Sequence, residues 1–272
     1  MLTVLIPCKD ERYNIEECIA SARLLGGEIL VADSGSTDGT LEIVARQPDC
    51  RLIEREFVNY ADFKNWAIPQ ASNPWVFVLD SDERVTPQLA DEIKRTLASD
   101  PQDIDAYWVP REVYFMGHKA RFGPWLHDGV HRLFRRDVCR YGECLVHESL
   151  DCDPERTARL RSKLIHYTIN SYDEFFSKYI NYTRWSAAER WDRGRRTSLL
   201  KMLVAPLFRF FWLYIFRGGF RDGAVGVQTC MLQAFFVTFV KQGRLWEWEN
   251  ACPPEEETPD VIPMTDTSRK VA

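Results

Sequence analysis

The sequence lacks the pattern of a disulfide-rich, secreted protein. None of its 8 cysteines forms a C-x-x-C pair, and the chain opens on the apolar run LTVLIPC instead of a signal peptide. We therefore expect a reducing, cytosolic compartment. Cys139, Cys144, His147 and Cys152 could supply zinc ligands, but the C-x4-C spacing fits the common zinc sites poorly.

The chain also lacks a positive net charge and an uninterrupted apolar run long enough to cross a membrane. The net charge of −5 argues against a general nucleic-acid binder. Residues 198–216 contain Lys201, Pro206 and Arg209, and the run at 225–240 is shorter than the ~20 residues of a spanning helix. We expect both runs, flanked by arginines, to lie on the cytoplasmic face of a bilayer without crossing it. The alternative is a pair of ordinary core helices.

Strands and helices alternate through the first hundred residues. Apolar runs predict strands, and amphipathic segments between them predict helices. This alternation predicts the α/β class, with a mostly parallel sheet, flanking helices and right-handed crossovers. The expected strands lie at residues 3–8, 28–33, 50–56 and 74–80, and the expected helices at 13–25, 39–47, 60–71 and 86–100.

The pattern changes after this region. Residues 105–165 contain strand-like segments without long helices, which predicts a mixed or antiparallel arrangement. Residues 171–191 indicate a helix that begins with a capping box of Ser171 and Glu174. The other expected helix ends are Asn14, Gly26 and Thr86.

Acidic residues follow three of the expected strands, in PCKDE, ADSGSTD and LDSDE. In a parallel sheet these carboxyl ends share one edge, where ligands bind. Asp80 and Asp82 together can hold one Mg²⁺ or Mn²⁺, which leaves positions open for substrate phosphates. Asp33 can accept hydrogen bonds from a ribose or a base, and Asp38 can act at the following helix or towards the base. The sequence therefore predicts a nucleotide site in which a metal carries the phosphates.

The same residues resemble the family 2 glycosyltransferases, which are inverting enzymes of the GT-A fold. IPCKDE, VADSGSTDGT, DFKNWAI and VFVLDSDE are similar to the family's motifs in order and spacing. Asp10 stands where the first motif usually has Asn, and the second motif matches in full from Asp33 to Thr40. This resemblance covers about residues 2–150.

The resemblance implies a Rossmann-like GT-A domain that binds a nucleoside-diphosphate sugar and a divalent metal. It implies donor binding by Pro7, Lys9, Glu11, Asp33, Asp38, Lys64 and Asp80, and metal binding by Asp82, Asp80 and His166. The base that deprotonates the acceptor hydroxyl is expected to be Glu148, in VHESL, or Asp128, in WLHDGVHRLF. Asp128 could instead pair with Arg132 or Arg135.

Later segments resemble the branch that builds bacterial lipopolysaccharide cores, often by adding glucose to a heptose. They include WLHDGVHRLFRRD, LIHYTINSYDEFFSKYINYT and FRGGFRDGAVGVQTCMLQAFF. The likeness implies a UDP-sugar donor, a hexose as the transferred sugar, a glycan or lipid-linked acceptor, and peripheral attachment to the inner membrane. The expected domains are a catalytic domain at 1–168, divided near residue 100, a membrane-associating helical region at 169–250 and a disordered tail at 251–272.

Two other classes of protein remain open from the sequence. A nucleotidyltransferase would need a glycine-rich, basic loop after the first strand, and PCKDERYN contains no glycine. A sugar-nucleotide binding module without catalysis would need no base, whereas Asp80, Asp82 and Glu148 are all present. Metal-dependent hydrolysis of sugar nucleotides separates these classes.

Overall fold

A computed structural model describes residues 2–99, 101–142 and 150–251, which form two compact units. Within these limits, the first unit contains residues 2–112 and 128–167, and the second contains residues 113–127 and 168–251. The domain boundary expected at residue 168 stays a prediction, and so does the disordered tail, since residues 252–272 lie outside the described part.

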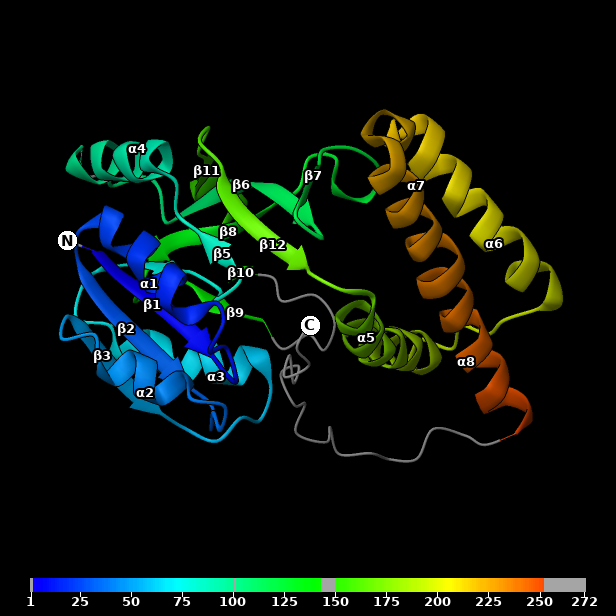
Figure 1. Cartoon of the computed structure of the whole chain (residues 1–272), viewed down its shortest axis with the longest axis horizontal. Helices are drawn as coiled ribbons and strands as arrows, with labels where there is room; N and C mark the ends of the chain where they lie inside the picture. Colours follow the sequence, from blue (N-terminus) through cyan, green and yellow to red (C-terminus); the bar gives the residue numbers. More distant parts are fainter. Residues whose placement is uncertain (1, 100, 143–149, 252–272) are drawn as a thin grey trace. The chain divides into compact units, whose positions relative to one another are not determined.

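The first unit is built on a sheet whose strands run in the order β3-β2-β1-β4-β8-β6-β12-β5 (Figure 1). Pairing is parallel among β1, β2, β3 and β4, whereas β8 is antiparallel to both β4 and β6. The predicted α/β class, with a parallel first half and a mixed second half, is confirmed. The elements are β1 (Leu2–Cys8), α1 (Ile15–Ala22), β2 (Glu28–Asp33), α2 (Thr40–Ala45), β3 (Cys50–Glu54), α3 (Tyr60–Ala67), β4 (Trp75–Val78), β5 (Glu83–Arg84), α4 (Pro87–Ala98), β6 (Ala106–Phe115), β8 (Gly129–Arg135), β9 (Arg140–Tyr141), β10 (Leu150–Asp151), β11 (Thr157–Arg159) and β12 (Leu164–Ile169), and the last residues of β6 and β12 belong to the second unit.

Helices cover both faces of this sheet because successive strand residues point to opposite sides. Val4 and Ile6 of β1 pack in one buried cluster with residues of α1 and α4. Leu5, between them, packs in a second cluster with residues of α3. Since β1 and β4 are buried on both faces, each appears in the sequence as a continuous apolar run.

Local signals set most of the helix ends. Thr86 accepts a hydrogen bond from the Leu89 amide at 3.2 Å and caps α4 as predicted. Gly26 ends the first helical segment in the left-handed region, at φ 65°. Asn14 occupies the N-cap position of α1 as predicted, but its side chain makes no capping hydrogen bond and its amide donates to the Glu11 carboxylate instead.

The second unit is mainly helical. Ser171 caps its first helix as predicted, since the Glu174 amide donates to the Ser171 hydroxyl at 3.1 Å. The Glu174 carboxylate accepts from the Asn170 amide at 2.8 Å, one residue earlier than in the standard capping box. The elements are β7 (His118–Ala120), α5 (Tyr172–Asp192), α6 (Leu199–Phe211), the π-helical η5 (Trp212–Phe216), α7 (Gly223–Met231), the π-helical η7 (Leu232–Thr238) and α8 (Phe239–Asn250).

Both apolar runs of the second unit lie in long helical stretches, and the second stretch is longer than its apolar run. The helical stretches Leu199–Phe216 and Gly219–Asn250 are long and apolar enough to cross a membrane, judged by length and composition alone. Only 11% of the first apolar window and 28% of the second is buried. These helices are therefore largely exposed within the described part of the chain, unlike ordinary core helices.

Candidate active site

The carboxyl ends of β1, β2 and β4 bring the predicted acidic loops to one edge of the first unit's sheet. The parallel register sets Cys8, the last residue of β1, beside Asp33, the last residue of β2. The Leu79 amide donates to the Leu5 carbonyl at 2.9 Å, which extends the pairing of β4 towards Asp80. The sequence prediction that these acids share an edge is confirmed.

The loops after β1 and β2 are joined by hydrogen bonds. The Asp10 amide donates to the Ser36 hydroxyl at 2.8 Å, and the Asp10 carboxylate accepts from the Thr37 amide at 2.7 Å. The Arg12 amide donates to the Asp38 carboxylate at 3.0 Å. Asp10 is held in the left-handed region, at φ 53°. Asp and Asn adopt this conformation more readily than most residues, so Asp10 can replace the usual Asn without losing the loop geometry.

Asp33 is fully buried and holds its own loop. Its carboxylate accepts hydrogen bonds from the backbone amides of Gly35 and Ser36, both at 2.8 Å, and from the Ser36 hydroxyl at 2.5 Å. The Cys8 thiol lies 3.4 Å from the same carboxylate. The Gly/Ser loop therefore needs this negative charge to order its backbone amides, and contact with a nucleoside stays a prediction.

Asp38 has a similar local role at the start of α2. It accepts hydrogen bonds from the Thr40 amide at 3.0 Å and the Thr40 hydroxyl at 2.5 Å. Burial acts to raise the pKa of Asp38, but the hydrogen bonds from Thr40 and Arg12 outweigh it and lower the pKa. Pro7, Lys9 and Glu11, also predicted to bind the donor, lie half-buried at the end of β1 and in the loop after it.

Asp82 and His166 converge at the same edge. Asp82 Oδ2 lies 3.3 Å from His166 Nε2, and both side chains are mostly buried. The pairing of β12 with β5 sets His166 opposite Glu83, next to Asp82 in the chain. The other ring nitrogen, Nδ1, is buried without a hydrogen-bond partner in the described residues, so the strand pairing and the contact with Asp82 orient the imidazole.

Asp80 is held by two cations. Its carboxylate is hydrogen-bonded to Arg132, and Lys64 Nζ lies 3.7 Å from Oδ1. Burial alone would raise the pKa of the Asp80 carboxyl, but Arg132 and then Lys64 hold it well below its usual range. Asp80 is therefore an anion that is already partly neutralised, whereas Asp82 faces an imidazole.

The donor atoms fit a divalent cation bound mainly through Asp82 and His166. A carboxylate oxygen and an imidazole nitrogen suit Mn²⁺, and Mg²⁺ commonly uses one or two carboxylates together with substrate phosphates. No group of three His, Cys, Asp or Glu side chains that could hold a metal ion is found among the described residues. A cation held here would therefore need oxygen ligands from a bound substrate to complete its coordination.

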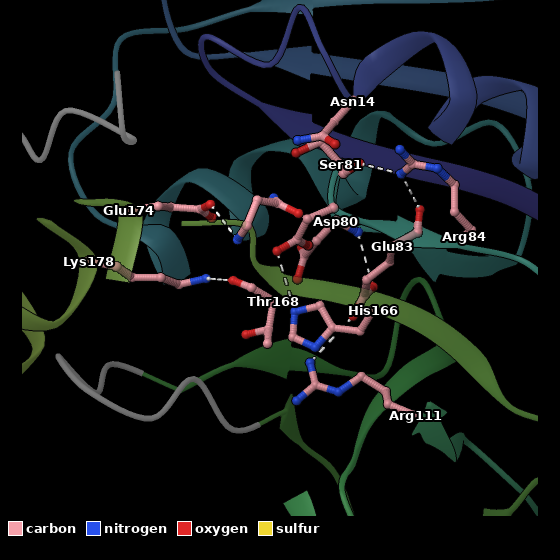
Figure 2. A network of polar contacts seen from close by, with 12 residues as sticks. Asn14, Asp80, Ser81, Glu83, Arg84, Arg111, His166, Thr168, Glu174 and Lys178 are labelled. Atoms are coloured by element: carbon pink, nitrogen blue, oxygen red, sulfur yellow. Dashed lines mark hydrogen bonds and ion pairs between the residues drawn. The ribbon is translucent and has the colours of Figure 1, made fainter. Parts of the chain in front are cut away.

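A buried ion-pair network lies next to these residues and was not predicted, and Figure 2 shows two of its members, Glu83 and Arg111. Glu83 is fully buried, and its Oε1 lies 2.7 Å from Arg132 Nη2 and 3.4 Å from Arg111 Nη1. Arg111 donates to both carboxylate oxygens of Asp128, at 2.8 and 3.1 Å. Asp128 therefore pairs with Arg111, which the sequence analysis did not consider. The sequence contains one signal for this network, the arginines inside strands β6 and β8. A charged side chain in a buried strand needs a partner of opposite charge, so these arginines indicate buried acids nearby.

The two base candidates differ in what the structure describes. Both carboxylate oxygens of Asp128 already accept hydrogen bonds from Arg111, which leaves less capacity to accept a substrate proton. Glu148 and His147 lie outside the described residues.

The disfavoured zinc set is only partly described, because Cys144 and His147 lie outside the described residues. Cys139 of that set is buried, and burial raises the pKa of its thiol to about 12.

Lys64 is positioned by a clamp between α3 and β9. The Asn65 side chain donates to the Tyr141 carbonyl at 2.8 Å and accepts from the Tyr141 amide at 2.9 Å. Lys64 Nζ lies 5.1 Å from the centre of the Tyr141 ring, and the side chain is 8% exposed. The charge beside Asp80 is therefore fixed by the fold.

Comparison with known proteins agrees with this geometry. Residues 3–142 match the model of glycosyl transferase family 2. The chain is 28% identical over 251 residues to the lipopolysaccharide core biosynthesis glycosyltransferase LpsC of Rhizobium meliloti, which covers 90% of this chain and 92% of the relative. An uncharacterized glycosyltransferase of Rickettsia bellii is 24% identical over 271 residues, which cover 96% of this chain and 91% of the relative.

Solved structures give more distant likenesses. S. aureus TarS in complex with UDP-GlcNAc superposes with a TM-score of 0.45 at 16% identity, covering 86% of this chain and 79% of that one. Glucosyl-3-phosphoglycerate synthase from Mycobacterium tuberculosis, in complex with Mn²⁺, UDP and glucosyl-3-phosphoglycerate, gives a TM-score of 0.47 at 16% identity, covering 73% and 81%.

Proposed function

The chain belongs to glycosyl transferase family 2 and is a glycosyltransferase, and on this premise we propose that it moves a hexose from a UDP-sugar to a lipid-linked glycan, with inversion, by direct displacement. The observation that carries this proposal is the approach of Asp82 Oδ2 to His166 Nε2, at 3.3 Å, at the edge where β1, β2 and β4 end. This arrangement offers a metal site for a diphosphate beside loops that can hold a nucleoside.

Donor binding is assigned to the joined loops and the basic side chains near them. We propose that the nucleoside binds against the loop that Asp33 and Asp38 order. Pro7, Lys9 and Glu11 lie beside this loop and are proposed to contact the donor as well. Lys64 and Arg132, held next to Asp80, place positive charge where a leaving diphosphate needs it.

The metal is assigned to Asp82 and His166, with Asp80 close by. The chemistry such a cation supplies is Lewis-acid neutralisation of the leaving diphosphate. Asp82 and His166 would hold and orient it, and the buried Glu83 fixes Arg132, which in turn fixes Asp80.

The base is assigned to Glu148, with Asp128 as the alternative. The base takes the proton from the acceptor hydroxyl as that oxygen attacks the anomeric carbon from the face opposite the leaving diphosphate. Arg111 holds both oxygens of Asp128, which favours Glu148.

The acceptor proposal has two supports. The similarity to LpsC, named for lipopolysaccharide core biosynthesis, suggests a core oligosaccharide. The apolar side chains exposed along α6 and η5 suit contact with a lipid surface. They include Leu199, Leu200, Leu203, Phe208, Phe211, Trp212, Ile215 and Phe216. We propose peripheral attachment to the cytoplasmic face of the inner membrane.

The catalytic proposal is tested by donor hydrolysis and transfer. The purified chain is incubated with UDP- and GDP-hexoses, Mn²⁺ and a truncated lipopolysaccharide core, and release of the nucleoside diphosphate is followed. We expect metal-dependent release from a UDP-hexose and sugar incorporation into the core. Binding without release would indicate a binding module, and formation of pyrophosphate from a nucleoside triphosphate and a sugar phosphate would indicate a nucleotidyltransferase.

Membrane attachment is tested separately by fractionation. High salt or carbonate should release the protein from membranes, and charge reversal at Arg193, Arg195 and Arg196 should weaken its attachment. Resistance to carbonate would indicate that Leu199–Phe216 or Gly219–Asn250 crosses the bilayer. Full solubility in a lysate would contradict membrane attachment.

A further inference from the structure

Three helices of the second unit bring basic side chains together in a largely apolar layer. Arg190 lies in α5, Arg209 in α6 and Lys241 in α8, and each is half-buried. Helix α8 packs against both α5 and α6. Lys241 Nζ lies 5.8 Å from the centre of the Tyr182 ring of α5, which places the ammonium group between these helices.

No carboxylate among the described residues pairs with this basic cluster. Across the described residues, no ion pair or side-chain hydrogen bond involves Arg190, Arg209 or Lys241. Glu189, next to Arg190 in α5, is already paired with Arg193 at 2.5 Å. Within the described part of the chain, Lys241 therefore lies near Arg190, Arg209 and the Tyr182 ring, and none of the three cations is paired with an acid.

The electrostatics of the cluster show that this arrangement is unfavourable on its own. Burial, together with Arg190 and Arg209, lowers the pKa of Lys241 to about 8. Burial and then the nearby Arg217 lower the pKa of Arg209. Like charges that are partly removed from water and unpaired are costly, and such groups are commonly kept for binding.

We propose that Arg190, Arg209 and Lys241 form a binding site for a phosphoryl group. Two guanidinium groups can donate paired hydrogen bonds to phosphate oxygens, and an ammonium group adds a compact point charge. A bound phosphoryl dianion would replace the missing carboxylates and remove the repulsion among the three side chains.

The surroundings of Arg209 favour a lipid as the source of that group. Phe208, Phe211 and Trp212 are exposed on the same helical stretch, and the Phe208 and Trp212 rings stack with centroids 6.3 Å apart. Acyl chains can lie on this apolar face while the phosphate reaches the basic cluster. A free phosphorylated molecule would use the same three cations without the apolar face, so the experiment has to separate the two sources.

The test measures phosphate binding by the full chain in non-ionic detergent and its flotation with vesicles. One arm titrates inorganic phosphate and pyrophosphate. The other compares phosphatidylcholine vesicles with and without phosphatidic acid. The variants Arg209→Met and Lys241→Met remove charge but keep an unbranched stem, and Lys178→Met, an exposed lysine of α5, is the matched control.

We expect Arg209→Met and Lys241→Met each to weaken binding by about tenfold or more, the loss expected for one charged partner of an anion, with Lys178→Met unchanged. Preference for phosphatidic acid over free phosphate would identify a lipid, and the reverse would identify a soluble ligand. Absence of binding in both arms, or equal binding by all variants, would overturn the proposal. No sugar nucleotide is used, so this outcome is independent of the proposed transferase activity.

Thermal melting without ligand separates a binding site from a structural one. Removing one of three repelling cations should leave the melting temperature unchanged or raise it, while phosphate should stabilise the original chain more than the variants. If Lys241→Met lowers the melting temperature and phosphate stabilises all variants equally, the cluster is structural and the proposal is wrong.

Discussion

Asp82 and His166 set a carboxylate oxygen and an imidazole nitrogen 3.3 Å apart, although they lie 84 positions apart in the sequence. The loop after β4 supplies the carboxylate, and β12 supplies the imidazole through its pairing with β5. Neither residue alone specifies a metal, and the proposal that they bind one rests on their closeness.

Loss of either ligand should impair metal-dependent transfer. Asp82→Ala should abolish turnover, and His166→Ala should raise the Mn²⁺ concentration needed for half-maximal rate by about tenfold or more. Initial rates across a Mn²⁺ titration measure both effects, with Ser81→Ala as the control from the same loop. Turnover by Asp82→Ala that persists in a chelator would refute the metal-assisted mechanism.

The choice of base is tested with two isosteric changes. Glu148→Gln should reduce kcat by about 10²–10⁴-fold and leave donor binding intact, because the amide keeps the shape but loses the basicity. Asp128→Asn should have the smaller effect on kcat, since Arg111 already holds that carboxylate. Single-turnover kinetics and donor titration separate these effects, and the opposite ranking would assign the base to Asp128.

Asp33 should govern donor affinity more than rate. Asp33→Ala removes the acceptor for the Gly35 and Ser36 amides, so the loop after β2 loses its order. The nucleoside changes little during reaction, and the defect should therefore appear as a raised KM with kcat largely kept. Calorimetric titration with UDP gives the affinity directly. A large fall in kcat with unchanged UDP affinity would contradict this role.

Glu28 should make stability depend on pH. Burial acts to raise the pKa of Glu28, but hydrogen bonds from Thr3, Ser72 and Arg51 lower it from 4.5 to about 2. A folded pKa below the unfolded value gives stability that is complete above pH 4.5 and is lost as the pH falls towards 2.

Glu28→Gln should therefore reduce the free energy of unfolding at pH 7 by about 1–2 kcal/mol after allowance for solvent screening, and by less at pH 3. Denaturant unfolding at the two pH values measures the difference, with the exposed Glu42→Gln as the control. An equal loss at both pH values would mean that the charge of Glu28 does not stabilise the fold.

The sequence predicted which acidic residues lie at the edge of the sheet, because the position of each residue at the end of a strand determines this. Asp33 ends a strand, and Asp80 and Asp82 follow one, so parallel pairing brings them to one edge. The sequence could not predict which acidic side chain forms an ion pair with which basic side chain. Asp128 was expected near Arg132 or Arg135, yet its partner is Arg111, because strand register and not chain distance decides such pairs.

Hydropathy also underestimated the last helix. The apolar run at 225–240 looked too short to cross a membrane, whereas the helix that contains it extends over Gly219–Asn250. Polar residues such as Lys241 end the apolar pattern but do not end the helix, since Lys is a good helix former.

The hydrogen bonds between the loops after β1 and β2 also bear on how quickly a donor can be captured. The amides of Arg12 and Thr37 are bound to carboxylates of the opposite loop, so this edge keeps its shape without a ligand. Capture then needs no slow rearrangement of these loops, and the entropic cost of ordering them is met during folding. Competing nucleotides should consequently associate at similar speeds and differ in residence time, so selectivity on this side would be decided by how fast the wrong donor leaves.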